Sequence, residues 1–118
     1  MFVWLSVQKL RLRYDPFAHS LWVPEPLTIE AVQAAISDGR LRASPWGGDA
    51  EDWTWLMHVE RVAYLVMHPD PTPIWVDLNL FCPVVDGNHR LAAAIVRGDA
   101  GILAEVHSGL DKIAEYAL

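Results

Sequence analysis

The side chains best suited to chemistry stand together in one short stretch, Asp86-Gly87-Asn88-His89-Arg90. Asp-Gly is a turn pair, because glycine readily adopts positive φ. A helix that begins here brings unpaired N–H groups and the positive end of its dipole together, which makes an anion site. The dipole disfavours a cation at that end, so Arg90 and a charged His89 indicate an anionic ligand, most often phosphate. The alternative is a plain turn in which Arg90 pairs with a nearby carboxylate.

A strand and a helix are predicted on the two sides of this turn. Val84-Val85 is short and β-branched and is bounded by the turn pair, which predicts the end of a buried strand. Leu91 to Val96 is an apolar run made mostly of alanine, the best helix former. The predicted order is therefore strand, tight turn and helix, with the polar residues of the turn in the first helical turn or at its cap.

The stretch from Val85 to Ala94 resembles the signature of the ParB/sulfiredoxin-like superfamily. Members carry a G-x-H-R or G-E-R-R type turn after a strand, followed by an alanine-rich helix, a glycine and a last strand. Gly98 and the apolar Ile102–Val106 continue this pattern, and the resemblance extends from about Pro73 to Val106. It implies an α+β fold: one ParB/sulfiredoxin-like domain over residues 1–118, with a small mixed sheet and about four helices.

The resemblance also implies a ligand and the residues that hold it. In this superfamily the turn and the helix start hold nucleotide phosphates, so ATP, ADP or CTP is expected at Gly87, Asn88, His89 and Arg90. Mg²⁺ is the expected companion, because phosphoryl transfer usually needs a metal. Asp86 and His89 are the candidates for catalysis of phosphotransfer or hydrolysis. Asp86 either holds Mg²⁺ through water or pairs with Arg90, and the pairing is favoured. Asn88 either orients a phosphate or caps the helix, and the cap is favoured.

The sequence does not place a general base in the site. The candidates are ionisable residues outside the turn, each more simply explained by surface exposure or pairing: Asp15, His19, Glu60 and Asp77. No two of the five histidines have the spacing of a zinc site. His58 and Arg61 lie one turn apart on a predicted helix and indicate only a polar face of that helix.

Two related chemistries are excluded by residue type. Sulfiredoxins need a cysteine directly before the His-Arg pair, where this chain has Asn88, so sulfinic-acid repair is excluded. Cys82 lies six residues earlier and is predicted to be a small buried hydrophobe. The turn also fits part of the Fic motif of AMP transferases, but Cys82 stands where the catalytic histidine of that motif belongs. Fic domains are all helical, whereas Ile74–Asn79 and Ile102–His107 predict strands.

Composition limits the remaining possibilities. The 118 residues suffice for one domain, and a hydrophobic content of 53% predicts a well-filled core. No apolar run reaches the roughly 18 residues that a membrane span needs, and the N-terminus lacks the basic region of a signal peptide. Together with a single cysteine, these features favour the cytoplasm. The net charge of −6 argues against nonspecific DNA binding by this chain alone.

Two other functions stay open. A degenerate domain would keep the scaffold and use a tryptophan-rich surface to bind a protein partner or a second copy, although the simplest role of the six tryptophans is to fill the core. Lys9, Arg11 and Arg13 alternate with leucines, which predicts one basic face of a strand. A DNA-associated, nuclease-like role would be favoured if these three residues shared a face with Arg90.

The beginning of the chain predicts two strands and a helix. Phe2–Val7 is mostly apolar on both faces and predicts a central strand. Gln8–Tyr14 alternates cleanly between polar and apolar residues and is predicted to extend this strand or pair with it. Thr28 is predicted to cap a helix that ends at Asp38-Gly39.

A second, longer helix is predicted in the middle of the chain. Pro45–Gly48 is predicted as a turn rather than a mobile lid. Asp49 is predicted to cap a helix that runs to about His68, with Glu51 and Asp52 in its first turn. The elements that remain are predicted as follows: strand Ile74–Asn79 in a hairpin or meander with Val84-Val85, helix Asn88–Arg97, strand Ile102–His107 and a C-terminal helix Leu110–Leu118.

Overall fold

The computed structural model describes residues 1–19, 24–45 and 53–118. These residues form a mixed α+β domain, as predicted, and contain five α-helices where about four were expected. The strands are β1 (Phe2–Ser6), β2 (Ile74–Asp77), β3 (Val84–Asp86) and β4 (Gly101–Ser108). The helices are α1 (Val7–Arg13), α2 (Ile29–Ser37), α3 (Trp55–Met67), α4 (Asn88–Arg97), the short 3-10 helix η2 (Leu110–Lys112) and α5 (Ile113–Tyr116).

The four strands form one mixed sheet in the order β1-β4-β2-β3. β4 pairs antiparallel with β1 and parallel with β2, and β2 and β3 form the predicted antiparallel hairpin. The prediction that the first strand is central is wrong, because β1 lies at the edge of the sheet. Its two apolar faces have different surroundings: Leu5 is fully buried, whereas Phe2 and Trp4 are exposed.

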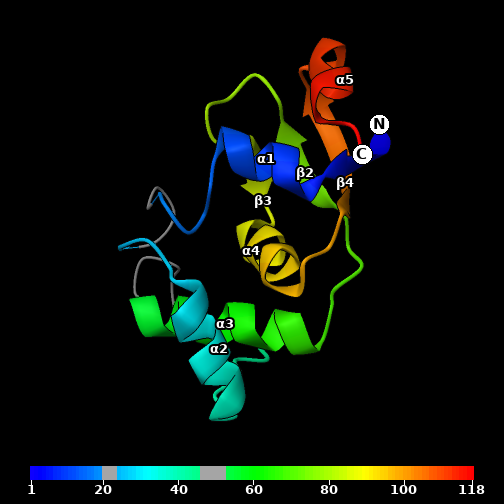
Figure 1. Cartoon of the computed structure of the whole chain (residues 1–118). Coiled ribbons are helices and arrows are strands. Elements are labelled where there is room, and N and C mark those ends of the chain that lie inside the picture. Colours follow the sequence, from blue (N-terminus) through cyan, green and yellow to red (C-terminus); the bar gives the residue numbers. More distant parts are fainter. Residues whose placement is uncertain (20–23, 46–52) are drawn as a thin grey trace.

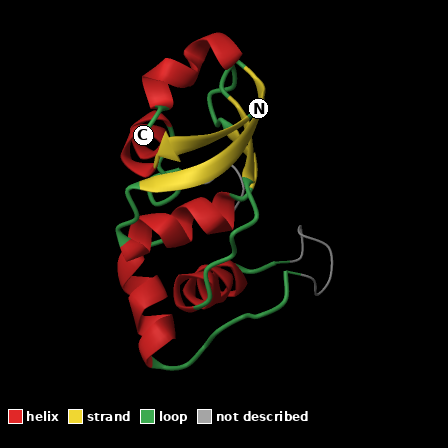
Figure 2. Ribbon diagram, turned by 90° about the vertical axis from the view of Figure 1, so that its right-hand side faces the viewer, coloured by secondary structure: helices red, strands yellow, loops and turns green. Residues whose placement is uncertain are grey.

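Two hydrophobic cores lie on opposite sides of α4. Figure 1 shows α4 between the sheet with α1 on one side and α3 with α2 on the other, and Figure 2 shows the same succession from the side. Leu91 and Ala94 of α4 belong to the core beneath the sheet, whereas Ala92 and Ala93 belong to the core shared with α2 and α3. Short alanine side chains let the backbone of α4 approach both layers closely, which explains the alanine-rich sequence of this helix.

Residues Val7–Arg13 form helix α1, so the strand predicted over Gln8–Tyr14 is wrong. The Ser6 hydroxyl caps this helix by accepting a hydrogen bond from the Lys9 backbone N–H. Leu10 is fully buried while Leu12 is 80% exposed. In a strand these two residues would share one face, whereas in a helix they point in different directions. The predicted basic strand face is therefore absent.

The three cations of that predicted face make separate local contacts. The ammonium of Lys9 donates to the carbonyl of Ala117, and the guanidinium of Arg13 donates to the carbonyl of Leu80. Arg11 forms an ion pair with Asp15, with an N–O distance of 3.0 Å. Lys9 and Arg13 are four positions apart and share a face of α1, but Arg11 between them points in another direction, so α1 does not present a continuous stripe of all three cations.

The predicted boundaries of α2 are confirmed, and those of α3 are partly confirmed. The Thr28 hydroxyl accepts from the Ala31 N–H at the start of α2, and α2 ends at Ser37, before Gly39 with φ +68. α3 ends at Met67, as expected for a helix that stops before Pro69, but it begins at Trp55 and is capped by Thr54. The cap predicted at Asp49 is therefore not the cap of α3.

Several predictions fall outside the described residues. These are the positions of Asp49, Glu51 and Asp52 and most of the predicted turn Pro45–Gly48. At the other end of the chain, the predicted helix over Leu110–Leu118 is formed by η2 and α5 as far as Tyr116. No helix in residues 1–19, 24–45 and 53–118 combines the length and hydrophobicity needed to cross a membrane.

Tryptophans are not confined to the core. Trp53 is buried, as predicted for a core filler, but Trp4 and Trp75 are 56% and 46% exposed. Both exposed tryptophans belong to strands, and neither takes part in the two hydrophobic cores. The prediction that the tryptophans fill the core is therefore wrong for Trp4 and Trp75.

Candidate functional site

β3, Gly87 and α4 form the predicted strand, tight turn and helix. β3 ends at Asp86, and Gly87 follows with φ +109, a left-handed conformation that favours glycine. A Cβ atom at Gly87 would lie 2.5 Å from Cγ2 of Ile74, so the turn packs against β2 more closely than any side chain would allow. Val84 is buried as predicted, whereas Val85 is exposed.

The N-terminus of α4 has no side-chain cap, because its N-cap residue is Gly87. The prediction that Asn88 caps the helix is wrong. Its amide Nδ2 instead donates to the carbonyl of Val84 on the preceding strand, at 3.2 Å. The Oδ1 atom of Asn88 is buried and has no hydrogen-bond partner in the described part of the chain. Asn88 therefore ties the helix start to β3 and leaves the first turn of α4 uncapped.

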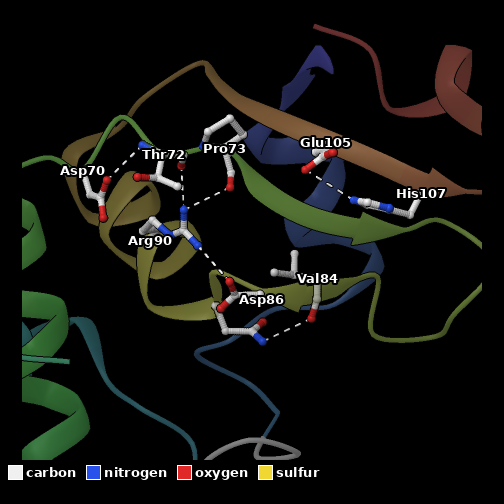
Figure 3. A network of polar contacts seen from close by, with 9 residues as sticks. Asp70, Thr72, Pro73, Val84, Asp86, Arg90, Glu105 and His107 are labelled. Atoms are coloured by element: carbon white, nitrogen blue, oxygen red, sulfur yellow. Dashed lines mark hydrogen bonds and ion pairs between the residues drawn. The ribbon is translucent and has the colours of Figure 1, made fainter. Parts of the chain in front are cut away.

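Arg90 is held firmly in place at one end of its guanidinium group. Nη1 donates to the carbonyls of Thr72 and Pro73, at 2.6 and 3.1 Å, and thereby joins α4 to the connection that leads into β2 (Figure 3). Nη2 lies 3.5 Å from Oδ2 of Asp86, which confirms the favoured pairing of these two residues. The arginine side chain is 14% exposed and the aspartate side chain 75% exposed, so water screens this ion pair.

The side chain of His89 points toward α3 and not toward the guanidinium of Arg90. Its Nε2 atom lies 2.8 Å from Nδ1 of His58, and the two rings are stacked with their centroids 5.1 Å apart. Trp53 packs against both rings. Burial lowers the pKa of His89 to about 3, and the neighbouring His58 adds to this effect. The imidazole is therefore neutral near pH 7, and the positive charge expected there is absent.

His58 is the functional candidate that sequence reasoning missed. It is buried, and burial lowers its pKa as well. Its spacing to Arg61 predicts only a polar face of the helix. A usable signal was present, because His58 lies three residues after Trp55 and four before Val62, within the apolar stripe of α3.

A cavity of about 260 Å³ lies beside Arg90 and runs along α4. Arg90 and Arg97 contribute guanidinium groups to its wall, and Asp70 and Asp99 contribute carboxylates. Arg97 is engaged by Asp99, at 2.8 Å, and by a backbone carbonyl of α3. Hydrogen bonds from the Thr72 side chain and backbone lower the pKa of Asp70, whose carboxylate is therefore charged at neutral pH. The lining residues that remain are Trp4, Leu65, Pro71, Thr72, Ala93, Gly101, Ile102 and Leu103.

The four residues considered as general bases are engaged elsewhere. Asp15 pairs with Arg11, and Glu60 lies 3.6 Å from a guanidinium nitrogen of Arg40. The remaining two make local contacts: the carboxylate of Asp77 accepts from the Asn79 N–H, and the ring of His19 stacks on that of Tyr14. In the described residues, none of these contacts brings a base to Arg90.

Cys82 and the acidic residues do not form a metal centre in the part of the chain that the structure describes. No three of its histidine, cysteine, aspartate and glutamate side chains gather as metal ligands would. Cys82 is partly buried, and burial raises the pKa of its thiol. Within the described residues, its Sγ atom makes a long polar contact with the Val84 carbonyl, at 3.9 Å, which fits the predicted role as a small packing residue.

Comparisons of this chain with protein-family models, with curated proteins and with solved structures found no match.

Proposed function

We propose that the turn Asp86–Arg90 and the adjoining cavity bind a phosphorylated small molecule. A nucleotide such as ATP, ADP or CTP is the ligand class that the resemblance to the ParB/sulfiredoxin-like superfamily implies. The observation that supports this most strongly is the position of Arg90, whose guanidinium is fixed at Nη1 and lines a cavity of about 260 Å³.

The contacts of Arg90 leave room for an anion. Two carbonyls hold Nη1 and set the plane of the guanidinium, so little side-chain freedom is lost when a ligand binds. Nη2 makes only a long, screened contact with Asp86 among its described polar contacts. An exposed ion pair of this kind contributes about 0–1 kcal/mol, so a phosphate that forms short charge-assisted hydrogen bonds can displace it.

The first turn of α4 adds to the attraction of an anion. Arg90 lies in this turn, and Gly87 brings no side chain that would cap its N–H groups. The positive end of the helix dipole therefore lies within one turn of Arg90, which is the one residue of Gly87–Arg90 that lines the cavity. The neutral His89 contributes no charge, so Arg90 and the backbone carry the electrostatic part of the proposal.

Asp86 is the residue that would take part in a catalytic step. Its side chain is 75% exposed beside Arg90, where a carboxylate can accept a proton or hold Mg²⁺ through water. The proposal therefore separates binding, which depends on Arg90, from phosphotransfer or hydrolysis, which would depend on Asp86.

Calorimetric titration with ATP, ADP, CTP and GTP, each with and without Mg²⁺, tests the proposal. The wild type is compared with Arg90→Ala, with Arg90→Lys, which keeps the charge but loses the two-pronged geometry, and with Arg13→Ala. Arg13 is a matched control, because it also donates to a backbone carbonyl but lies on α1. We expect saturable binding that Arg90→Ala weakens at least tenfold, that Arg90→Lys weakens less, and that Arg13→Ala leaves unchanged.

Two results would overturn the proposal. One is the absence of heat with all four nucleotides from a protein whose thermal unfolding shows it to be folded. The other is binding of equal affinity in wild type and in a folded Arg90→Ala variant, because the phosphate would then lie elsewhere.

A further inference from the structure

One row of residues crosses all four strands of the sheet and alternates between aromatic and acidic side chains. Phe2 on β1 is opposite Glu105 on β4, Glu105 is opposite Trp75 on β2, and Trp75 is opposite Asp86 on β3. Directly opposed residues point to the same face of a sheet. Phe2, Trp75 and Asp86 are exposed, and Glu105 is half-buried, with 42% of its side chain accessible. We call this row and its immediate neighbours the aromatic–acidic face.

Neighbouring residues extend the aromatic–acidic face. Trp4, two residues after Phe2, is opposite Leu103 and is 56% exposed. The ring of His107 lies 4.5 Å from that of Trp75, and its Nε2 atom lies 3.4 Å from Glu105 (Figure 3). Three large aromatic side chains therefore stand on one face of a four-stranded sheet.

The helices cover the other face of the sheet. Val3, Ala104 and Ile74 alternate with the exposed residues along their strands and belong to the core that α1 and α4 share with the sheet. No residue of the described helices belongs to a core on the aromatic–acidic side. An exposed apolar surface of this kind marks an interaction site more often than a simple solvent face.

The charges on this face decide between the possible occupants. Nucleic acid would bring phosphates against Glu105, which repels them, whereas the carboxylate of Asp86 is paired with Arg90. A second copy would repeat the same face across a twofold axis and bring like carboxylates together, in a chain whose net charge is already −6. A cationic partner is attracted by the carboxylates, and its guanidinium or ammonium groups also bind favourably over tryptophan and phenylalanine rings.

We infer that the aromatic–acidic face binds a basic, arginine-containing peptide segment of another protein. Adjacent strands lie about 4.8 Å apart, so the row of four spans roughly 14 Å, about the length of four extended residues. Arginine suits the alternation of groups better than lysine, because its planar guanidinium stacks on aromatic rings and pairs with carboxylates in a two-pronged manner. This surface adjoins the site of the nucleotide proposal, because Asp86 pairs with Arg90 and Trp4 lines the cavity. Phe2, Trp75 and Glu105, on which the test below depends, do not line the cavity.

NMR titration of the folded protein tests the inference. The probes are two synthetic peptides, one alternating arginine with threonine and one alternating glutamate with threonine. The readout is the indole N–H resonance of Trp75, identified from its loss in Trp75→Ala. We expect the arginine peptide alone to shift this resonance saturably, with affinity reduced at least fivefold in Glu105→Gln and in Phe2→Ala. Leu12→Ala, which alters an exposed apolar residue on α1, is the control and should bind as the wild type does.

Other outcomes would overturn the inference. Equal binding of the arginine peptide to wild type and Glu105→Gln, or no saturable shift at millimolar peptide, would do so. Self-association in sedimentation that Trp75→Ala abolishes would assign the face to a second copy. Saturable binding of oligo(dT) that Phe2→Ala and Trp75→Ala abolish would assign it to nucleic acid.

Discussion

The Nδ1 atom of His58 on α3 lies 2.8 Å from the Nε2 atom of His89 on α4, with the two rings inclined by only 11°. One of these nitrogens must donate a proton and the other accept it, so the contact is a hydrogen bond while at least one ring is neutral and is lost when both rings are doubly protonated. His89 directly precedes Arg90, the residue proposed to hold phosphate. The histidine pair therefore connects the buried layer of α3 to the start of α4.

The first prediction concerns acid sensitivity. Burial lowers the pKa of His89 from its ordinary value of 6.5 to about 3 and lowers that of His58 as well. Between these two values the unfolded chain binds a proton that the folded chain does not, so the free energy of unfolding falls as the pH falls. The contribution of the neutral His89 to the free energy of unfolding is complete above pH 6.5. At most about 1.4 kcal/mol is lost per pH unit for one histidine, or about 2 kcal/mol between about pH 7 and pH 5.

Urea unfolding at these two pH values measures the effect. His89→Gln should flatten the dependence on pH, because glutamine accepts and donates hydrogen bonds without titrating. His107→Gln is the control, since His107 is exposed on the sheet. The pKa of Asp70 is lowered from 3.8, so this carboxyl group titrates at more acidic pH and does not alter stability between pH 5 and pH 7. An unchanged slope in His89→Gln would contradict the assignment.

The second prediction concerns the energetic coupling of the pair. His58→Ala removes one partner and leaves the buried His89 without that hydrogen bond, so we expect a loss of about 1–3 kcal/mol in the free energy of unfolding. The double variant His58→Ala/His89→Ala should cost less than the sum of the two single variants, by about 0.5–3 kcal/mol. Strict additivity in chemical denaturation would show that the two rings do not interact.

The third prediction concerns the turn itself. Gly87→Ala must accept both a positive φ and a Cβ atom 2.5 Å from Ile74. Gly98, at the other end of α4, also has positive φ, but no heavy atom lies within 4 Å of a Cβ built there. Gly98→Ala should therefore cost about 1–2 kcal/mol for backbone strain alone, and Gly87→Ala about 1–3 kcal/mol more for the steric overlap. Equal losses in chemical denaturation would mean that the turn moves away from β2 at little cost.

The fourth prediction concerns the single cysteine. Burial raises the pKa of Cys82 above its ordinary value of 9.0, so very little thiolate exists near neutral pH. Iodoacetamide should alkylate the folded protein at least tenfold more slowly than the same protein in urea. Glutathione under both conditions corrects for the effect of urea on the reagent, and equal rates would show that the thiol is open to solvent.

The turn and its flanking elements could be predicted because their signals are local. An Asp-Gly pair between β-branched residues and an alanine run specifies strand, turn and helix with little help from tertiary contacts. The helix boundaries Asn88 and Arg97 are confirmed for this reason. The ion pair between Asp86 and Arg90 could also be predicted from the sequence, since the two residues are four positions apart.

The errors arose where tertiary contacts decide. Alternating Lys9, Arg11 and Arg13 suggested a strand, but Ser6 supplies a helix cap and Leu10 packs in the core. The Asn88 side chain bonds backward to Val84 because β3 ends directly beside the helix start. His58 looked like a surface residue because nothing in the sequence shows that His89, 31 residues later, lies opposite it.

The position of β4 between β1 and β2 has a consequence for biosynthesis. Among the strands that the structure describes, β1 pairs only with β4, and the backbone of Met1 meets that of Val106, 105 positions later. The sheet cannot close until residues 101–108 have left the ribosome, so until then the nascent chain carries Phe2 and Trp4 on an unpaired edge. Contacts of such long sequence separation slow folding, and exposed edges favour misassociation. The nascent chain therefore depends on protection of Phe2 and Trp4 until β4 has been synthesised.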